Sequence, residues 1–515
     1  MIHNKPLIGI TLFIGAISLS LCTFMQVLDI SIANVSIPYI AGDLAVSVND
    51  GTWVITMFAV GNAISLPLTG WLTRRFGSIR IMVLSVLSFT IVSWLCGISL
   101  SINMLVTMRF VQGFVAGPLI PLSQSLMIMS FPKEKKNLAL AIWNMVAIVG
   151  PIAGPILGGW ITYNYSWPWI FFINVPVGIF CTLAIRAIYK DKETPIEKIQ
   201  VDKVGILLLA LSVSSLQIIL DYGQQFDWWR SNTIRVLTII SFLSFVFLFI
   251  WERFQKHPIF DLKMFKNRNF ALGTALVAIS FMLLFGAIVI TPLWLQETMG
   301  YTAYLAGLAV SPMGIIPFFT VLMVAKLMNY VRLRYLIMFS FFIYGLALLY
   351  FTTFTTQVTF EEIALSRLFL GVGICIWLAP LTAITFARIP HEQLATGQGL
   401  FHFFRILMGG VGTSIFVTIW ERRATHHHSN LIDSINPFNP ISRELLSNLN
   451  RLNIRGEKAL QVVDTMAWKQ AYMLSLNDIF WIAGWAFSLF IVLTIFFKDR
   501  KKKQLIPGRA SIKTS

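Results

Sequence analysis

The stretch AIVGPIAGPILGGWI, residues 147–161, carries no charge and contains four glycines and two prolines. Gly150, Gly154 and Gly158 recur every four residues, and such positions lie on one face of an α-helix. Small residues on one face allow a neighbouring helix to approach closely, and prolines bend the helix that contains them. Ordinary close packing between membrane helices would use the same pattern. The stretch therefore predicts a bent, tightly packed membrane helix.

The remainder of the chain has the composition of a polytopic membrane protein. Of its 515 residues, 56% are hydrophobic and only 12% are charged, too few to cover a soluble protein of this length. A helix needs about 20 apolar residues to cross a bilayer core about 30 Å thick. Such runs predict an all-α fold with about fourteen transmembrane helices, at approximately 9–38, 52–72, 81–100, 104–126, 138–160, 168–187, 203–222, 234–252, 270–292, 302–325, 333–353, 361–384, 397–420 and 474–497.

Lysine and arginine are concentrated in alternate connections between these helices. The net charge of +17 would by itself also suit a nucleic-acid-binding protein. However, the connections around 39–51, 101–103, 161–167, 293–301 and 354–360 contain no Lys or Arg, whereas the intervening ones are basic. Because basic loops remain in the cytoplasm, the alternation predicts that both termini are cytoplasmic. It also argues against nucleic acid as a partner.

One outer segment, residues 421–473, is much longer than the others. Apolar residues recur at helical spacing in RELLSNLNRLNIRGEKALQVVDTMAWKQ, residues 443–470, so we expect one or two amphipathic helices outside the membrane. His426, His427 and His428 are adjacent and lack a spaced fourth ligand, which indicates a solvated polar turn rather than a metal site.

A weak internal repeat relates the two halves of the chain. MRFVQGFVAGPLIPLSQ, from residue 108, contains Arg109, Gly113 and Pro121, and SRLFLGVGICIWLAPLTA, from residue 366, has an arginine, a glycine and a proline in comparable places. Parallel repeats of this kind occur in transporter folds.

Four stretches of the first half resemble motifs of the major facilitator superfamily. Residues 147–161 resemble the helix 5 antiporter motif of its drug:proton antiporters, GWLTRRFGSIR (70–80) the loop 2–3 motif, RFVQGFVAG (109–117) the helix 4 motif and LDISIANVSIPYI (28–40) the helix 1 motif of fourteen-helix members. Residues 257–270 and 292–314 are similar to stretches of the same subfamily. The resemblance covers essentially the whole chain, and within this subfamily the chain resembles EmrB-type multidrug efflux pumps.

The resemblance implies two six-helix bundles, residues 1–190 and 261–515, joined by two extra helices in 191–260. It implies a bacterial inner-membrane antiporter that exchanges protons for hydrophobic drugs and works with a periplasmic membrane-fusion adaptor and an outer-membrane channel. The residues expected to act in gating are Gly70, Arg74, Arg75, Gly77, Arg80, Gly150, Pro151, Gly154, Pro155, Gly158 and Gly159. Arg74 stands where the loop 2–3 motif usually has an aspartate, whose role Asp202 or Glu134 could take.

Asp29 is the most informative polar residue, because it interrupts the uncharged run of the first helix. Charged groups within the membrane are costly and usually face a functional cavity, so Asp29 is a candidate proton-binding or substrate-facing group. The alternative is that it marks the outer end of the helix. Arg109 is its expected partner and a second proton-coupling candidate; the alternative is a structural arginine that ties its helix to neighbouring backbone carbonyls. His402 and Arg405, three residues apart on one face, are further proton-coupling candidates. For His402 alone, the residues favour a hydrogen-bonded interior histidine slightly over a proton-coupling group.

The chain contains no G-x-x-x-x-G-K-[ST] loop, so a proton gradient rather than ATP is the expected energy source. Neither a nucleophile–base set nor metal-ligand spacing appears, so we expect a secondary transporter without cofactors and not an enzyme. The alternatives left open are a proton-coupled carrier for one metabolite or siderophore, and a non-transporting membrane scaffold. Residues expected to line a broad, mostly apolar drug cavity are Asn34, Trp53, Asn62, Gln124, Gln217 and Trp377.

Overall fold

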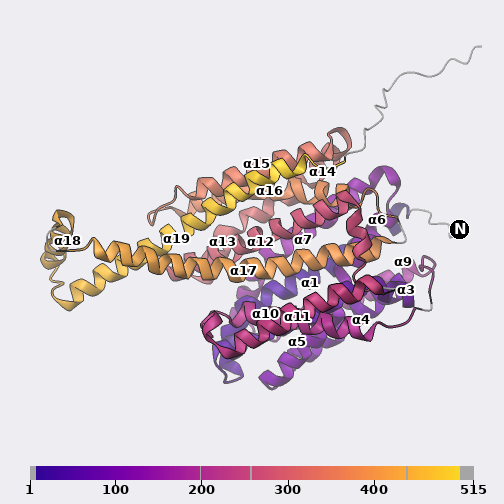
Figure 1. Ribbon diagram of the computed structural model, residues 1–515, viewed down its shortest axis with the longest axis horizontal. Coiled ribbons are helices and arrows are strands. Elements are labelled where there is room, and N and C mark those ends of the chain that lie inside the picture. Colours follow the sequence, from indigo (N-terminus) through magenta and orange to yellow (C-terminus); the bar gives the residue numbers. More distant parts are fainter. Residues whose placement is uncertain (1–6, 198, 256–257, 391–392, 437–438, 499–515) are drawn as a thin grey trace, which may run out of the picture.

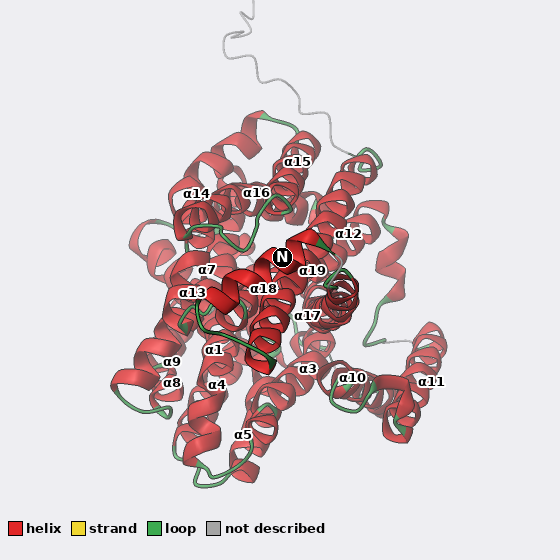
Figure 2. Ribbon diagram, turned by 90° about the vertical axis from the view of Figure 1, so that its left-hand side faces the viewer, coloured by secondary structure: helices red, strands yellow, loops and turns green. Residues whose placement is uncertain are grey.

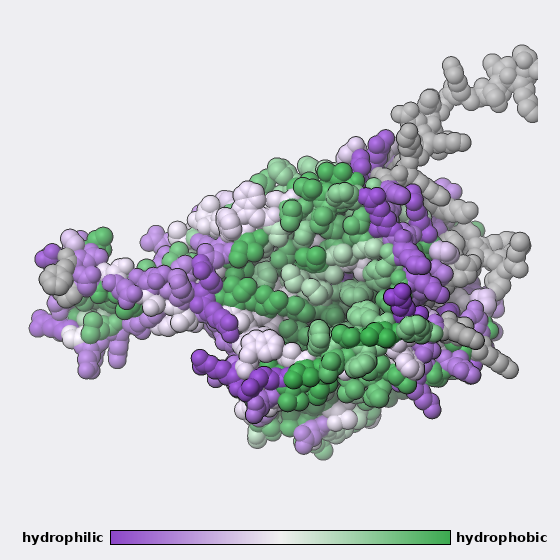
Figure 3. Space-filling view, in the orientation of Figure 1, coloured by the Kyte–Doolittle hydropathy of each residue, from purple (hydrophilic) through white to green (hydrophobic). Residues whose placement is uncertain are grey.

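A computed structural model describes residues 7–197, 199–255, 258–390, 393–436 and 439–498. Within these ranges the chain consists of helices and loops without a strand (Figure 2). On the face seen in Figure 3, a broad apolar band crosses the body between two hydrophilic ends, as expected of a protein that crosses a bilayer. The structure thus confirms the predicted all-α, multi-pass membrane fold.

The first six predicted spans form the N-terminal bundle. Two of them are broken: Gly117 and Pro118 separate α5 from α6, and a bend of 46° divides α7 between Pro151 and Ile156. The helices of this bundle are α1 (Gly9–Asp43), α2 (Val48–Gly51), α3 (Trp53–Phe76), α4 (Ser78–Gly97), α5 (Ile102–Ala116), α6 (Leu119–Ser130), η1 (Lys133–Lys135), α7 (Lys136–Asn164), α8 (Trp169–Phe172) and α9 (Asn174–Tyr189).

Two helices, α10 (Lys203–Tyr222) and α11 (Asn232–Phe254), follow the N-terminal bundle and pack against each other at one side of the body (Figure 2). The short η2 (Trp228–Arg230) connects them. Of the two, α10 contacts α3 and α17, whereas α11 exposes apolar side chains such as Phe242 and Phe247. An exposed apolar helix face in a membrane protein faces lipid.

The C-terminal bundle repeats this construction, including a span broken at Ser311 and Pro312. Its helices are η3 (Leu262–Lys266), α12 (Arg268–Glu297), α13 (Ala303–Val310), α14 (Pro312–Tyr330), α15 (Leu333–Phe351), α16 (Phe360–Phe386), α17 (Leu394–Asp433), α18 (Pro440–Arg451) and α19 (Glu457–Thr494). Among the described residues, twelve helices are long and apolar enough to cross a membrane, and the bent α7 adds a thirteenth. The broken pair α13–α14 occupies the remaining predicted span, so the arrangement is consistent with fourteen.

The last two long helices, α17 and α19, extend far beyond the body as an antiparallel hairpin that carries α18 at its tip (Figure 1). His426–His428 lie inside α17, so the expected polar turn is wrong. His427 Nε2 lies 2.7 Å from a carboxylate oxygen of Asp478, and His428 Nε2 lies 2.8 Å from one of Asp464. These contacts join the two helices of the hairpin, and no cluster of metal-ligating side chains occurs in the described ranges.

Candidate functional site

Asp29 lies inside the N-terminal bundle and forms an ion pair with Arg109. Both side chains are completely buried, and Arg109 Nη1 donates to Asp29 Oδ2. The helix α1 continues to Asp43, and fourteen further residues correspond to about 21 Å at 1.5 Å per residue. Asp29 therefore does not stand at the end of its helix.

Three neutral side chains complete the surroundings of this ion pair. Asn174 Nδ2 on α9 donates to Asp29 Oδ1 at 3.0 Å, and Gln112 Nε2 on α5 donates to the same oxygen at 3.3 Å. Both amides also donate to Ser93 Oγ on α4, at 2.9 and 3.0 Å. The carboxylate thus accepts hydrogen bonds from residues of two helices and is connected to a third. Sequence reasoning missed Asn174, Gln112 and Ser93, although polar residues within apolar runs were the available signal.

Arg109 is held by further contacts on α3. Its Nε donates to the Val54 carbonyl at 3.1 Å, and its guanidinium carbon lies 4.3 Å from the centre of the Phe58 ring. The α3–α5 crossing leaves no room for a side chain at Gly113, since an added Cβ would lie 2.8 Å from the Phe58 carbonyl carbon. The glycine of the RFVQGFVAG stretch therefore brings α5 near enough for its arginine to reach the backbone of α3.

The C-terminal bundle repeats the arginine but not its carboxylate. Arg367 on α16 is buried and donates from Nη2 to Thr291 Oγ1 on α12 at 2.7 Å. Its guanidinium carbon lies 4.1 Å from the centre of the Phe351 ring. The weak sequence repeat therefore corresponds to a structural repeat in which Thr291, in place of Asp29, accepts the hydrogen bond of the arginine.

A ridge of glycines on α7 packs against α1, the helix that carries Asp29. Added Cβ atoms on Gly150 and Gly158 would lie 2.8 Å from Val27 Cγ1 and 2.9 Å from Ile32 Cγ1. A Cβ on Gly154 would overlap the Ser31 side chain and lie 3.0 Å from the Ile32 backbone nitrogen. Gly159, by contrast, faces open space, so it does not belong to the ridge that packs against α1. The bend of α7 falls between Pro151 and Ile156 and therefore includes Pro155.

The turn between α3 and α4, which contains the loop 2–3 motif, is capped by Glu193. This carboxylate accepts hydrogen bonds from the backbone nitrogens of Ile79 and Arg80 at 2.9 and 3.0 Å. Gly77 has φ of 93°, a conformation that side chains disfavour, and places these nitrogens at the start of α4. The carbonyl of Arg74 accepts from the Glu197 backbone at 2.8 Å. The connection from α9 to α10 therefore wraps this turn.

The two residues expected to replace the missing aspartate lie elsewhere. Asp202 caps α10 by accepting from the Gly205 backbone at 2.9 Å and from the Trp251 indole at 3.0 Å. Glu134 is exposed in η1. Glu193 is the carboxylate that contacts the motif. Gly70, at the other end of the motif, allows α3 to meet α17, because its added Cβ would lie 2.8 Å from the Thr396 Cα.

We expect Glu193→Ala to destabilise the protein, because it leaves two nitrogens of the first turn of α4 without an acceptor. Loss of a helix cap costs about 1 kcal/mol. Because the shift per kcal/mol decreases with chain length, the midpoint of thermal unfolding in detergent should fall by about 1 °C. Glu197→Ala is the matched control, because Glu197 is exposed and its contact with Arg74 uses the backbone. Equal midpoints for the two variants would contradict the capping role.

His402 lies where the two bundles meet. Its Nε2 is 2.8 Å from Gln124 Oε1 on α6, and its ring lies 5.4 Å from that of Trp143 on α7. Arg405, one turn further along α17, has its guanidinium carbon 4.8 Å from the centre of the Phe281 ring on α12. His402 and Gln124 thus form a direct polar contact between the halves.

The remaining substrate candidates do not gather around one point. Asn62 donates to the Gly113 carbonyl at 3.4 Å, and Trp377 packs 5.8 Å from Phe281 within the C-terminal bundle. Trp53 stacks on Tyr222 of α10 at 4.5 Å. Gln217 is close to Gly410 on α17 and donates to Asp221 at 3.0 Å, and Asn34 is exposed.

Comparison with known proteins agrees with this architecture. The human organic anion transporter MFSD10 has a solved structure that aligns over 93% of this chain and 98% of its own, with a TM-score of 0.53 and 13% identity, a likeness of fold alone. The chain is 44% identical to the Multidrug export protein EmrB of Escherichia coli (strain K12), over 97% of this chain and 98% of that protein. It is 40% identical to the Fatty acid resistance protein FarB of Neisseria gonorrhoeae, over 95% and 96%.

The family model of the Major Facilitator Superfamily matches residues 19–413, which include the Asp29–Arg109 pair, the glycine ridge and the arginine of the second half. Together with the near full-length relatives, this match establishes that the chain belongs to the Major Facilitator Superfamily of membrane transporters.

Proposed function

We propose that the protein exports hydrophobic toxic compounds in exchange for protons. The observation that carries the proposal is the buried Asp29–Arg109 ion pair within the N-terminal bundle. Relatives named as multidrug export and multidrug resistance proteins, at 44% and 42% identity, support the substrate class. A buried carboxylate is costly in a structural role and suits a group that gains and loses a proton.

The contacts of Asp29 suggest how proton binding would act on the fold. Protonation of the carboxylate would remove its charge and weaken its attraction to Arg109, so α1 and α5 would separate more easily. The glycine ridge would transmit a shift of α1 to α7, which contacts α13, α14 and α16 of the other bundle. Protonation at Asp29 would thereby change how the two halves pack. His402 and Gln124 lie at the same interface and would respond to that change.

The location and partners belong to the same proposal. The protein resides in the bacterial inner membrane with both termini in the cytoplasm, and its two bundles, residues 1–190 and 261–515, rock about the interface while 191–260 bridge them. In this proposal the hairpin, which projects beyond the body (Figure 1), extends into the periplasm. There it holds a membrane-fusion adaptor that leads to an outer-membrane channel.

The proposal is tested with purified protein in liposomes under an imposed pH gradient and a panel of structurally unrelated dyes. We expect several dyes to move against their gradients only while the pH gradient lasts. Movement of a single metabolite-like compound would indicate a specific carrier, and no movement of any compound would indicate a scaffold.

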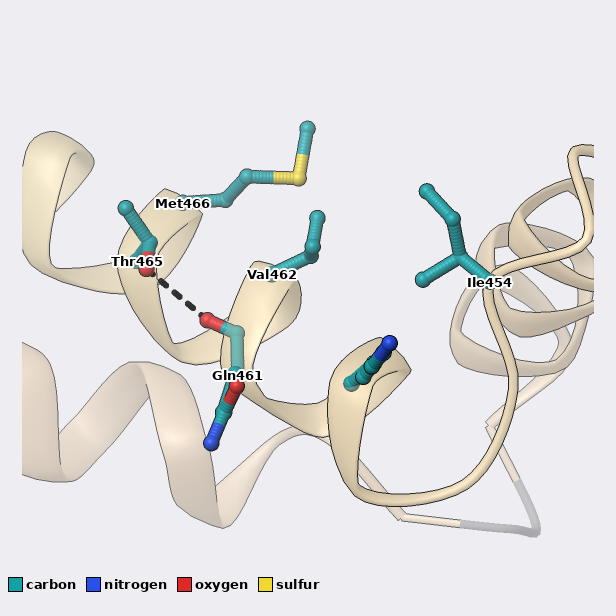
Figure 4. Close-up of a pocket in the computed structure, with 6 residues that line it drawn as sticks. Ile454, Gln461, Val462, Thr465 and Met466 are labelled. Atoms are coloured by element: carbon teal, nitrogen blue, oxygen red, sulfur yellow. Dashed lines mark hydrogen bonds between the residues drawn. The ribbon is translucent and has the colours of Figure 1, made fainter.

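Removal of the hairpin tip separates export from assembly. A variant in which a short Gly/Ser turn replaces residues 434–456 retains the body of α17 and α19. It removes α18 and Ile454, which lines the shallow pocket beside Val462 and Met466 (Figure 4). We expect unchanged dye transport in liposomes and loss of co-purification with the adaptor. Loss of liposome transport would contradict a purely docking role for the tip.

A further inference from the structure

Arg405 on α17 carries a buried charge for which the described part of the chain supplies no counter-charge. Its side chain is 5% exposed, and the ion pairs among the described residues do not include it. Its Nε has no hydrogen-bond partner. Arg109, by contrast, has a carboxylate partner. Arg367 also lacks a carboxylate and has an unpaired Nε, but it differs from Arg405 in donating a side-chain hydrogen bond from Nη2 to Thr291. A cation removed from water requires compensation, so an anion from outside the chain would satisfy Arg405.

Neutral polar side chains with unused hydrogen-bonding atoms lie on the same face of α17. Gln398 and His402 precede Arg405 by seven and three residues, which places all three on one side of the helix. Both amide atoms of Gln398 and Nδ1 of His402 are buried without partners. Gln124 Nε2, across the interface from His402, is also unpaired. Buried polar atoms are normally satisfied, so this accumulation at the junction of the two bundles indicates a polar ligand or ordered water.

An aromatic surface adjoins the charged end of this face. Phe281 lies beside the Arg405 guanidinium, stacks on Phe285 at 5.6 Å and meets Trp377 edge-on at 5.8 Å. A Cβ on Gly409, one turn beyond Arg405, would lie 3.5 Å from Phe285, so little separates that ring from α17. A site with one cation, a few amides and an aromatic wall suits a molecule with an anionic group and an apolar body.

We propose that Arg405 binds the anionic group of the exported compound, while Gln398 and His402 hydrogen-bond to it and Phe281 and Phe285 contact its apolar part. The inference rests on the proposed export function and adds the charge that the site selects. A purely structural Arg405, held by the Phe281 ring alone, would leave the unpaired atoms of Gln398, His402 and Gln124 unexplained.

Binding of three fluorescent ligands to the purified full-length protein in non-ionic detergent tests this assignment. They are pyrenebutyrate, its neutral methyl ester and the corresponding trimethylammonium cation, which share one apolar body. We expect the wild type to bind pyrenebutyrate at least tenfold more tightly than the other two. Arg405→Gln should lose at least tenfold in affinity for the anion and less than twofold for the ester, and Arg405→Lys should retain part of the preference.

Arg422→Gln is the matched control. Arg422 lies exposed on the same helix, and its substitution removes the same charge. Equal wild-type affinity for the three ligands, or preference for the cation, would overturn the proposal. So would an equal loss for all three in Arg405→Gln, which would indicate a structural role. If that variant does not fold, the wild-type comparison and Arg405→Lys decide. No pH gradient is used, so this result is independent of the liposome transport assay.

Discussion

Asp29→Asn should abolish the release of protons that follows addition of a transported dye to detergent-purified protein. The amide cannot carry a proton away. Its NH2 group would also face a hydrogen-bond donor in either orientation, Arg109 on one side or the amides of Gln112 and Asn174 on the other. Removing one partner of a buried ion pair costs about 3–5 kcal/mol, so we also expect a marked fall in the thermal midpoint. A pH-sensitive dye in weakly buffered solution measures the release, and differential scanning fluorimetry measures stability.

Two variants separate the loss of coupling from the loss of stability. In Asp29→Asn combined with Arg109→Gln both charges are removed, so much of the stability should return while proton release stays absent. Asp43→Asn is the control on the same helix, because Asp43 is exposed and an amide oxygen can still accept from the Trp167 indole. Wild-type release from Asp29→Asn would show that another group carries the proton.

Gly154→Val should inactivate transport, because no room exists for a side chain where α7 crosses α1. Its Cβ would overlap the Ser31 side chain, and overpacking of this kind costs about 1–3 kcal/mol even where neighbours relax. The helices would have to separate beside the segment that carries Asp29. We expect correctly inserted protein with little or no dye transport in liposomes.

Gly159→Val is the matched control, five residues further along the same helix. Nothing lies within 4 Å of a Cβ at Gly159, so this variant should transport at close to the wild-type rate. If both valine variants lose activity equally, the effect belongs to helix conformation and not to contact with α1.

The helices were predictable because the hydropathic requirement of a bilayer is strong and local. The breaks between α5 and α6 and between α13 and α14 were not predicted, since Gly117 and Ser311 leave each run apolar while interrupting the helix. The prediction also ended one span at residue 420, whereas α17 continues to Asp433. Hydropathy predicts where a helix leaves the membrane. It does not predict where the helix ends, because contact with a partner such as α19 can stabilise the helix outside the membrane.

The sequence predicted only those residues of the candidate site that are conspicuous within their own helix. Asp29 and Arg109 are conspicuous because each is a charge within an apolar run, and the structure pairs them. The contacts of Asn174 and Ser93 depend on how α4 and α9 approach α1, which no local pattern encodes. Glu193 was overlooked in favour of Asp202 and Glu134 for the same reason, since its contact with α4 spans more than a hundred residues of chain.

The continuity of α17 gives the outer hairpin a mechanical meaning. From His402 to Asp433 the helix rises for 31 residues without a proline, about 47 Å at 1.5 Å per residue. A tilt of about 10° at the bundle interface would displace the far end by about 8 Å over that length. If the protein works with an external partner, as proposed, the helix would act as a lever: a small rearrangement around the transported molecule would become a larger movement at the tip.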